Sequence, residues 1–255
     1  MKKFILPASL ACLLTILVII PTLTAKSNKS LVKGSAITVA DVTNDSMEAE
    51  SGTLSALEVA SGLLYDSLKL AAIGLPKHVM MMAYKGHQYM EERGLLGRDG
   101  IIAICDFSQS SKKKRLYIID TKNYRVLLNT FVAHGRNSGL DYAEKFSNTP
   151  ESLQSSLGFY VTKSTYSGKH GLSLKLSGVE RGFNDNAESR AVVIHGADYI
   201  GADRLSSPYM GRSFGCPAVP QEQSERVINY LKNGTCLFIY HPTQKYLHGS
   251  KILNG

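Results

Sequence analysis

Residues 190–220 read RAVVIHGADYIGADRLSSPYMGRSFGCPAVP, a stretch that joins an apolar run to a long polar loop and a cysteine. It begins with a short apolar run rich in β-branched residues, which predicts a central strand over 190–195. His195 ends this strand, and the glycine after it allows a sharp turn. The segment 196–215 has no strand pattern and leads to Cys216, which lies between a glycine and a proline. Long structureless connections in a compact domain are commonly functional, so this loop is a candidate site.

Short apolar runs separated by turn residues recur along the chain and are typical of strands. Few helices lie between them, so the sequence predicts a mainly β fold, a largely antiparallel β-sandwich or open barrel. A second long connection, 135–157, and one helix after the cysteine, 221–232, interrupt the strands. The predicted strands are 101–105, 115–120, 124–133, 158–166, 171–177, 190–195 and 235–241.

The N-terminus has the order of a secretory signal peptide. Lys2 and Lys3 precede an apolar run over 4–20, and a proline and small residues follow it, which predicts a signal peptide over 1–25. The run is about long enough to span a membrane if it is not cleaved. The sequence therefore predicts an exported protein of the periplasm or cell envelope, with membrane contact only through an uncleaved signal segment.

The rest of the chain divides by composition and periodicity. A polar segment after the signal peptide predicts a flexible leader, and two helical patterns follow it. Two helices of this length cannot bury a core alone, so we expect a helical flank on the β domain. The expected segments are the leader 26–52, the flank 53–98, the β domain 99–241 and a C-terminal tail 242–255.

The charge is moderately basic. Lys and Arg outnumber Asp and Glu by 29 to 21, a net charge of +8, which becomes +6 (27 minus 21) without the signal segment. This excess suits contact with an anionic polymer. The basic run 112–115 has no aromatic or glycine-rich neighbours of the kind that bind nucleic acid, so we expect a solvated turn there and no nucleic-acid partner.

Three cysteines follow the signal segment, and the odd number leaves at least one thiol outside any disulfide. Cys105 and Cys236 lie in apolar strand runs and are expected to be buried structural thiols, or a pair. Cys216 lies in an irregular segment shortly before a predicted helix. A helix N-terminus and a nearby imidazolium both stabilise a thiolate, so Cys216 is the candidate nucleophile.

His195 and Cys216 together form a candidate constellation for acyl transfer. A histidine at the end of a rigid strand can act as a general base, and free amides at 214–216 can bind an oxyanion. These are the parts needed for reaction through a thioester. The residues alone leave open a core histidine and a small buried thiol.

Several motifs around these residues resemble one enzyme family. The stretch from His195-Gly196 to Ser213-Phe214-Gly215-Cys216 resembles the signature of YkuD-type L,D-transpeptidases. Between residues 101 and 240 the sequence is similar to the murein branch of that family. The similar motifs are CDFSQSS, VAHGRNSG, SSLGFY, GLSLKLSGVERGFNDNA, VIHGADY and GRSFGCPAV.

The resemblance implies an L,D-transpeptidase-like β-sandwich that needs no metal or other cofactor. Its cysteine attacks the amide after the third residue of a peptidoglycan stem tetrapeptide, D-Ala leaves, and an amine takes the acyl group. The partners implied are therefore peptidoglycan stem peptides. The implied roles are Cys216 as nucleophile, His195 as base, Gly215 and Cys216 amides as oxyanion donors, Phe214 and Ser213 as loop support, and Arg212, Gly196 and Tyr199 as substrate contacts.

Other readings stay open. Phe214 and Ala218 stand where the commonest family pattern has a histidine and a basic or amide residue, so the acceptor is not fixed by the motif. It can be a second stem, a protein lysine, a free D-amino acid or water, and water would make the protein an L,D-carboxypeptidase. The alternatives from other classes are a zinc metallohydrolase using His134, His170 and His195, and a non-catalytic wall-binding protein.

Overall fold

A computed structural model describes residues 55–255 of the chain. The signal peptide and leader predicted for 1–52 lie outside these residues. Within the described part, no helix is both long and apolar enough to cross a membrane.

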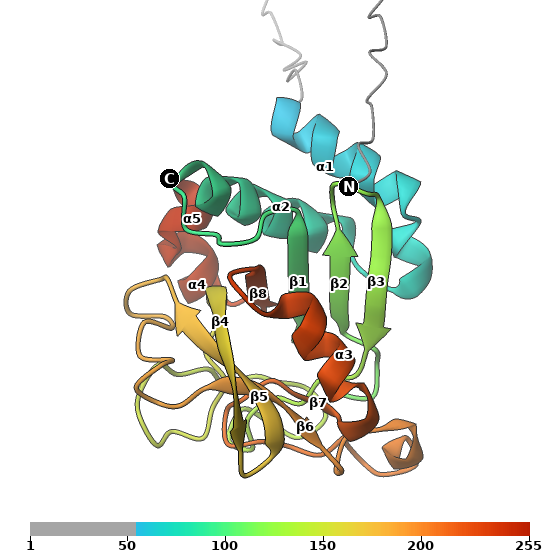
Figure 1. Cartoon of the computed structure of the whole chain (residues 1–255), viewed down its shortest axis with the longest axis vertical. Helices are drawn as coiled ribbons and strands as arrows, with labels where there is room; N and C mark the ends of the chain where they lie inside the picture. Colours follow the sequence, from blue (N-terminus) through green and yellow to red (C-terminus); the bar gives the residue numbers. More distant parts are fainter. Residues whose placement is uncertain (1–54) are drawn as a thin grey trace, which may run out of the picture. The chain divides into compact units, whose positions relative to one another are not determined.

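Eight strands form one hydrogen-bonded sheet in the order β3-β2-β1-β8-β4-β5-β6-β7 (Figure 1). The pairs β1–β8 and β6–β7 are parallel, and the other neighbours are antiparallel. The strands are β1 (Ile101–Asp106), β2 (Leu116–Asp120), β3 (Arg125–Thr130), β4 (Gly158–Gly168), β5 (Gly171–Gly178), β6 (Val193–Ala197), β7 (Ala218–Pro220) and β8 (Cys236–Tyr240). The predicted mainly β, largely antiparallel class is confirmed.

Three strands differ from the prediction, and one of them, β3, ends at Thr130 and not at residue 133. β6 begins at Val193 and not at residue 190, because Ala191 has φ 53° and cannot continue an extended strand. β7 was not predicted at all, since it is three residues long and ends in proline. The long connections before β4 and after β6 are confirmed, and the second contains only a short 3₁₀ helix, η2 (Ala202–Arg204).

Helices cover the sheet. The first described helix begins with a capping box, in which Ser55 accepts from the Glu58 amide and Glu58 accepts from the Ser55 amide. α2 packs against β1 and β8, and Figure 1 shows α3 lying across the strands, where it packs against β5, β6 and β7. The helices are α1 (Ala56–Ser67), η1 (Leu70–Ile73), α2 (Lys77–Glu92), α3 (Gln221–Leu231), α4 (Gln244–Gly249) and α5 (Lys251–Asn254).

α2 approaches the sheet closely at Gly86. A Cβ at this position would overlap the ring of Phe159 in β4, which itself stacks on Phe238 of β8 at 4.2 Å between ring centroids. The buried residues of α2 belong to the same apolar core as these strands. The helical flank is thus part of the β domain's core, as expected.

We expect Gly86→Ala to destabilise the fold although alanine is the better helix former. The overlap with Phe159 should cost about 1–3 kcal/mol or more, against about 1 kcal/mol gained from helix propensity. Gly62→Ala in α1 is the matched control, because its Cβ would meet only the Lys77 side chain at 3.8 Å. Urea unfolding should rank Gly62→Ala at or above the wild type and Gly86→Ala below it; equal effects would contradict this packing.

The C-terminal tail, 242–255, is helical and contributes to the core. Tyr246 is 1% exposed, and its hydroxyl donates to Glu180 at 2.9 Å. The same carboxyl group accepts from the Ser250 hydroxyl and, at 2.7 Å, from the Phe159 amide. Burial raises the pKa of Glu180, which these hydrogen bonds partly offset. The tail is therefore tied to the centre of the sheet.

Candidate active site

The parallel pair β6–β7 brings the candidate histidine and cysteine into one neighbourhood. His195 in β6 lies opposite Ala218 in β7, and Cys216 comes two residues before Ala218. Cys216 is therefore level with Val193, and its sulfur accepts a hydrogen bond from the Val193 amide at 3.5 Å. Alternate residues of a strand share a face, so Val193 and His195 present their side chains to the same side, about 7 Å apart.

A hydroxyl clamp shapes the loop before Cys216. Ser213 is 3% exposed; its Oγ accepts from the Gly215 amide at 3.0 Å and donates to the Cys216 carbonyl at 2.6 Å. Gly215 has φ 123°, and a Cβ there would meet the Gln154 carbonyl at 2.8 Å, so the turn requires glycine. The role of Ser213 as loop support, predicted from the resemblance, has this geometric basis.

We expect Ser213→Ala to lower the free energy of unfolding by about 1–3 kcal/mol, because the Gly215 amide and the Cys216 carbonyl both lose their partner. Urea denaturation measures this. Ser189→Ala is the control, since that exposed hydroxyl donates only to the Asn186 carbonyl outside the loop and its loss should change little. Equal stability of the two variants would show that the clamp is unimportant.

The Cys216 thiol is half-buried and neutral in its resting surroundings. It contacts the backbone at the start of β6, where its S–H points to the Ala191 carbonyl at 3.7 Å. Burial raises the pKa of Cys216, while the Val193 amide and the positive charge of Arg190 lower it. Hydrogen-bond donation and a cation are features that stabilise the thiolate once the proton leaves.

His195 is held in the tautomer that a general base needs. It is 3% exposed, and its Nδ1 lies 2.8 Å from the Gly196 carbonyl, which can only accept, so Nδ1 carries the proton and Nε2 is free. Burial lowers the pKa of His195, so the ring is neutral at neutral pH. The exposed His170, at the β4–β5 hairpin turn, stacks on it at 4.3 Å between centroids. Among the described residues no hydrogen bond joins His195 to Cys216 in this conformation.

The oxyanion donors differ from those that the resemblance implies. The Gly215 amide is used by Ser213, whereas no hydrogen bond within the described chain uses the amides of Phe214 or Cys216. The donors available in this conformation are therefore Phe214 and Cys216. The Phe214 side chain, two residues before Cys216, is 70% exposed, which suits contact with a bound substrate.

Arg190 is a site residue that the sequence did not single out, because the predicted strand included it. Its guanidinium is half-buried and hydrogen-bonded to the loop 147–156, whose Gln154 carbonyl lies against Gly215. Two residues of this loop, Glu151 and Leu153, have φ values of 59° and 56°, which are strained for side chains of their kind. A strained loop tied to the turn before Cys216 is typical of a functional site.

The three residues expected to contact substrate, Gly196, Tyr199 and Arg212, lie in β6 and in the connection that leads from β6 to Cys216. Tyr199 is half-buried, and burial with the neighbouring Cys216 charge raises its pKa to about 12. A Cβ at Gly196 would meet Gln221 at 2.5 Å, so this position needs glycine for packing against α3. Arg212 donates to the Arg136 and Gly139 carbonyls at 2.9 and 3.0 Å, so part of its guanidinium supports the neighbouring segment.

His134, one of the three histidines of the alternative zinc site, is buried and bound by a neighbouring arginine. Its Nδ1 accepts from the buried Arg115 at 2.7 Å, and its Nε2 lies 3.4 Å from the Gly139 carbonyl. Burial lowers the pKa of His134 to about 3. Nowhere in residues 55–255 do three His, Cys, Asp or Glu side chains gather as metal ligands.

The expectation of a solvated turn at 112–115 is wrong for Arg115. This side chain has no exposed surface, because the His134 ring and backbone carbonyls bind it.

The other two cysteines are free and deeply buried, as one of the sequence readings expected. Cys105 is 1% exposed and Cys236 is not exposed. Burial raises the pKa of Cys105 to about 12 and raises that of Cys236 further. Cys216 is thus the accessible thiol of the described chain.

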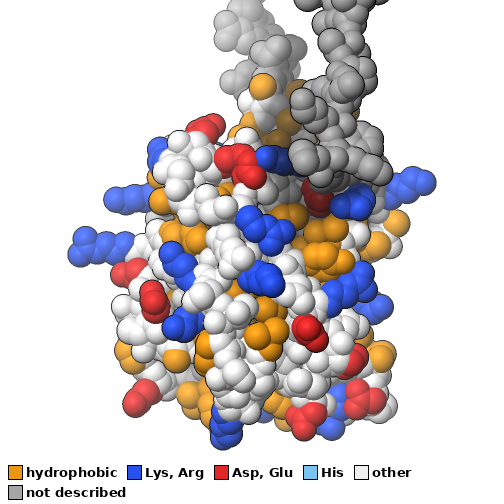
Figure 2. All heavy atoms as spheres, viewed as in Figure 1, with side chains coloured by type: hydrophobic (Ala, Val, Ile, Leu, Met, Phe, Trp, Pro, Cys, Tyr) orange, Lys and Arg blue, Asp and Glu red, His pale blue; other side chains and the backbone are white. Residues whose placement is uncertain are grey.

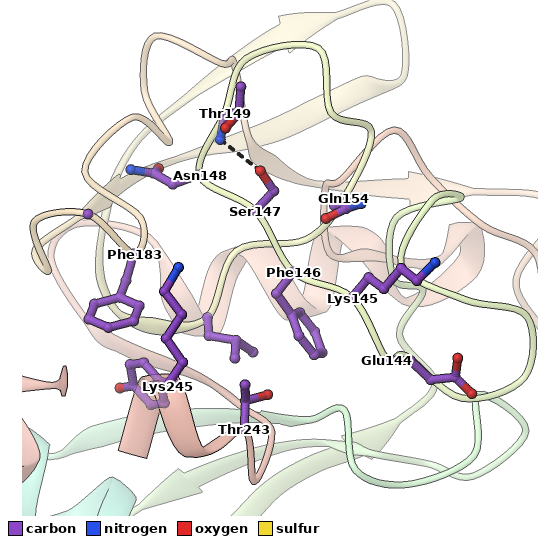
Figure 3. A pocket seen from close by; sticks show the side chains of 13 residues that line it. Glu144, Lys145, Phe146, Ser147, Asn148, Thr149, Gln154, Phe183, Thr243 and Lys245 are labelled. Atoms are coloured by element: carbon purple, nitrogen blue, oxygen red, sulfur yellow. Dashed lines mark hydrogen bonds between the residues drawn. The ribbon is translucent and has the colours of Figure 1, made fainter. Parts of the chain in front are cut away.

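A cavity of about 540 Å³ is lined in part by the loop 147–156. Figure 3 shows the aromatic side chains of Phe146 and Phe183 and the amines of Lys145 and Lys245 around it. Gln154 lines this cavity while its carbonyl contacts Arg190, so the loop forms a wall shared with the candidate site. On the face drawn in Figure 2, Lys and Arg side chains are interspersed with Asp and Glu and form no single basic block.

Comparison with known proteins gives one family match. The profile of the family described as "L,D-transpeptidase catalytic domain" matches residues 72–240. No curated protein matches the chain.

Solved structures give weaker likenesses. One is LD transpeptidase LdtMt1 in complex with imipenem, at 12% identity and TM-score 0.35, over 55% of this chain and 59% of that one. An L,D-transpeptidase from Mycobacterium smegmatis has 11% identity and TM-score 0.35, over 56% and 59%. One from Mycobacterium tuberculosis H37Rv has 14% identity and TM-score 0.34, over 56% and 58%. The chain thus spans less than two thirds of the length of each.

Proposed function

Because the chain belongs to the L,D-transpeptidase catalytic domain family, we propose that it is a cysteine-dependent peptidoglycan L,D-transpeptidase. The donor is a stem tetrapeptide. Cys216 attacks the carbonyl of its third residue, D-Ala leaves, and an amine of a second stem takes the acyl group from the thioester. Water in place of the amine makes the same chemistry a carboxypeptidase reaction.

The observation that supports this most is the placement of Cys216, the accessible thiol among residues 55–255, beside the start of the strand that carries His195. The sulfur leaves the Ala191 carbonyl and gives its proton to the free Nε2 of His195. Hydrogen bonds between catalytic groups are often absent in unliganded enzymes and form with substrate, so the present separation is compatible with this step.

Proton balance follows from the same two residues. The imidazolium formed at His195 protonates the departing D-Ala nitrogen, which regenerates the base. The neutral ring then accepts the proton of the acceptor amine as that nitrogen attacks the thioester, and it returns this proton to the Cys216 sulfur as the thiolate leaves. The amides of Phe214 and Cys216 donate to the oxyanion of both tetrahedral intermediates.

The substrate lies outside the cytoplasm, so the proposal includes export. Residues 1–25 are the proposed signal, and the polar leader 26–52 the proposed spacer to the described domain. Cell fractionation with N-terminal sequencing tests this part; an intact N-terminus in the cytosol would contradict it.

Mass spectrometry of muropeptides after incubation with the purified protein tests the function. We expect D-Ala release and dimers cross-linked between two third residues, unaffected by a chelator. Tripeptides without dimers would identify the carboxypeptidase. A folded protein that releases no D-Ala would contradict both reactions, and activity lost to a chelator and restored by zinc would favour a metallohydrolase.

A further inference from the structure

Arg190 has an unusual set of partners. Its two Nη atoms make four hydrogen bonds, so all four Nη hydrogens are used, and each acceptor is uncharged. No ion pair between described residues includes Arg190. The four acceptors are the Ser147 carbonyl at 2.8 Å, Ser156 Oγ, Ser152 Oγ at 3.2 Å and the Gln154 carbonyl at 2.8 Å.

This uncompensated charge lies beside the candidate nucleophile. Nη2 of Arg190 is 3.5 Å from the point where a Cβ on Gly215 would be, and Gly215 precedes Cys216. The residue after Arg190 is Ala191, whose carbonyl is the hydrogen-bond acceptor of the Cys216 thiol. Two consecutive residues therefore supply the nearby cation, Arg190, and the hydrogen-bond acceptor of the Cys216 thiol, the Ala191 carbonyl.

The other titratable groups that face the thiol carry no charge at neutral pH. Burial lowers the pKa of His195, and the pKa of the Tyr199 phenol is raised to about 12. Arg190 keeps its charge, although burial lowers its pKa from the usual value. Within residues 55–255, Arg190 is the fixed cation whose charge acts on the Cys216 sulfur.

We propose that Arg190 is a positioning residue that stabilises the thiolate of Cys216 with its fixed charge and holds the loop 147–156 against Gly215. Its saturated Nη hydrogens argue against a second role as a clamp for a substrate carboxylate. The charge assists transfer of the thiol proton to Nε2 of His195, since the anion left on sulfur then has a cation nearby. This inference rests on the proposed role of Cys216 but not on the identity of the peptide substrate.

The test is the pH dependence of alkylation of Cys216 by iodoacetamide in the full chain, followed by peptide mapping. Arg190→Gln should raise the apparent thiol pKa and slow alkylation at pH 7 by about tenfold or more, because an opposite charge at this range shifts a pKa by about one unit or more. Arg181→Gln is the matched control, since Arg181 is an exposed arginine on the same β5–β6 connection. Its alkylation profile should match the wild type.

Arg190→Lys separates charge from geometry and serves if Arg190→Gln does not fold. It keeps the charge but cannot satisfy four acceptors, so the thiol profile should stay near the wild type. A wild-type profile in Arg190→Gln, an equal shift in Arg181→Gln, or a full tenfold loss in Arg190→Lys would each overturn the proposal. The readout needs no peptidoglycan, so a failure of the muropeptide assay with a shifted Arg190→Gln profile would reject the proposed substrate and leave this role standing.

Discussion

Cys216→Ala is expected to remove D-Ala release from stem tetrapeptides, with a fall in rate of roughly four orders of magnitude or more. The methyl group can neither attack the carbonyl nor form the thioester. The fold should be unaffected, because the half-buried thiol makes only two weak sulfur hydrogen bonds to the start of β6. Release of D-Ala, followed by mass spectrometry, and the urea midpoint measure the two effects together.

The matched controls are the buried thiols. Cys105→Ala and Cys236→Ala each leave a small cavity in the core and should lower stability by about 1–2 kcal/mol. D-Ala release should persist in both, because neither thiol is accessible and burial raises the pKa of each. Retained activity in Cys216→Ala, or its loss in a folded Cys105→Ala or Cys236→Ala, would remove Cys216 as the nucleophile.

His195→Ala should lower turnover by roughly two to four orders of magnitude, the usual contribution of a general base. Without His195, the Cys216 thiol would have to lose its proton to solvent. Burial raises the pKa of this thiol, so that step is unfavourable. His170→Ala is the comparison, since that exposed ring only stacks on His195 and its loss should cost far less. Loss of folding in His195→Ala would instead support a structural histidine.

The role of His195 as general base also predicts how the activity depends on pH. Burial depresses the pKa of His195, so the ring stays neutral down to a pH below its usual value and only then stops accepting a proton. Wild-type activity should therefore fall on the acid side at a pH below about 6.5, the ordinary imidazole value. That acid limb should vanish from the residual activity of His195→Ala, and an unchanged limb would assign it to another group.

The strands and the two long connections were predictable because they leave a local signal. β1, β2 and β8 are apolar runs bounded by turns, and their burial on both faces matches that composition. The helix predicted at 221–232 is present as Gln221–Leu231, directly after Pro220, and its buried residues recur with helical spacing. Cys216 was separated from Cys105 by its glycine and proline neighbours, and in the structure it is less buried than Cys105.

The parts that were missed depend on contacts between distant segments. β7 forms because Ala218 pairs with His195 in β6. The three residues of β7 are too few to show a strand pattern in the sequence. The role of Arg190 comes from acceptors more than thirty residues earlier in the chain, whose carbonyls carry no side-chain signature. Ser213 was expected as loop support from the family resemblance alone, since glycine–serine turns are common in loops without chemistry and leave no local signal.

The most direct test of the central claim, that Cys216 is the acyl-accepting nucleophile, is covalent labelling with a carbapenem. Its strained lactam carbonyl takes the place of the scissile amide, so a thiolate beside a base and oxyanion donors should open it. Intact-protein mass spectrometry followed by peptide mapping should find one carbapenem per chain, on the peptide containing residues 213–217, and none in Cys216→Ala. An adduct on Cys105 or Cys236, or one that forms at full rate without Cys216, would contradict the account.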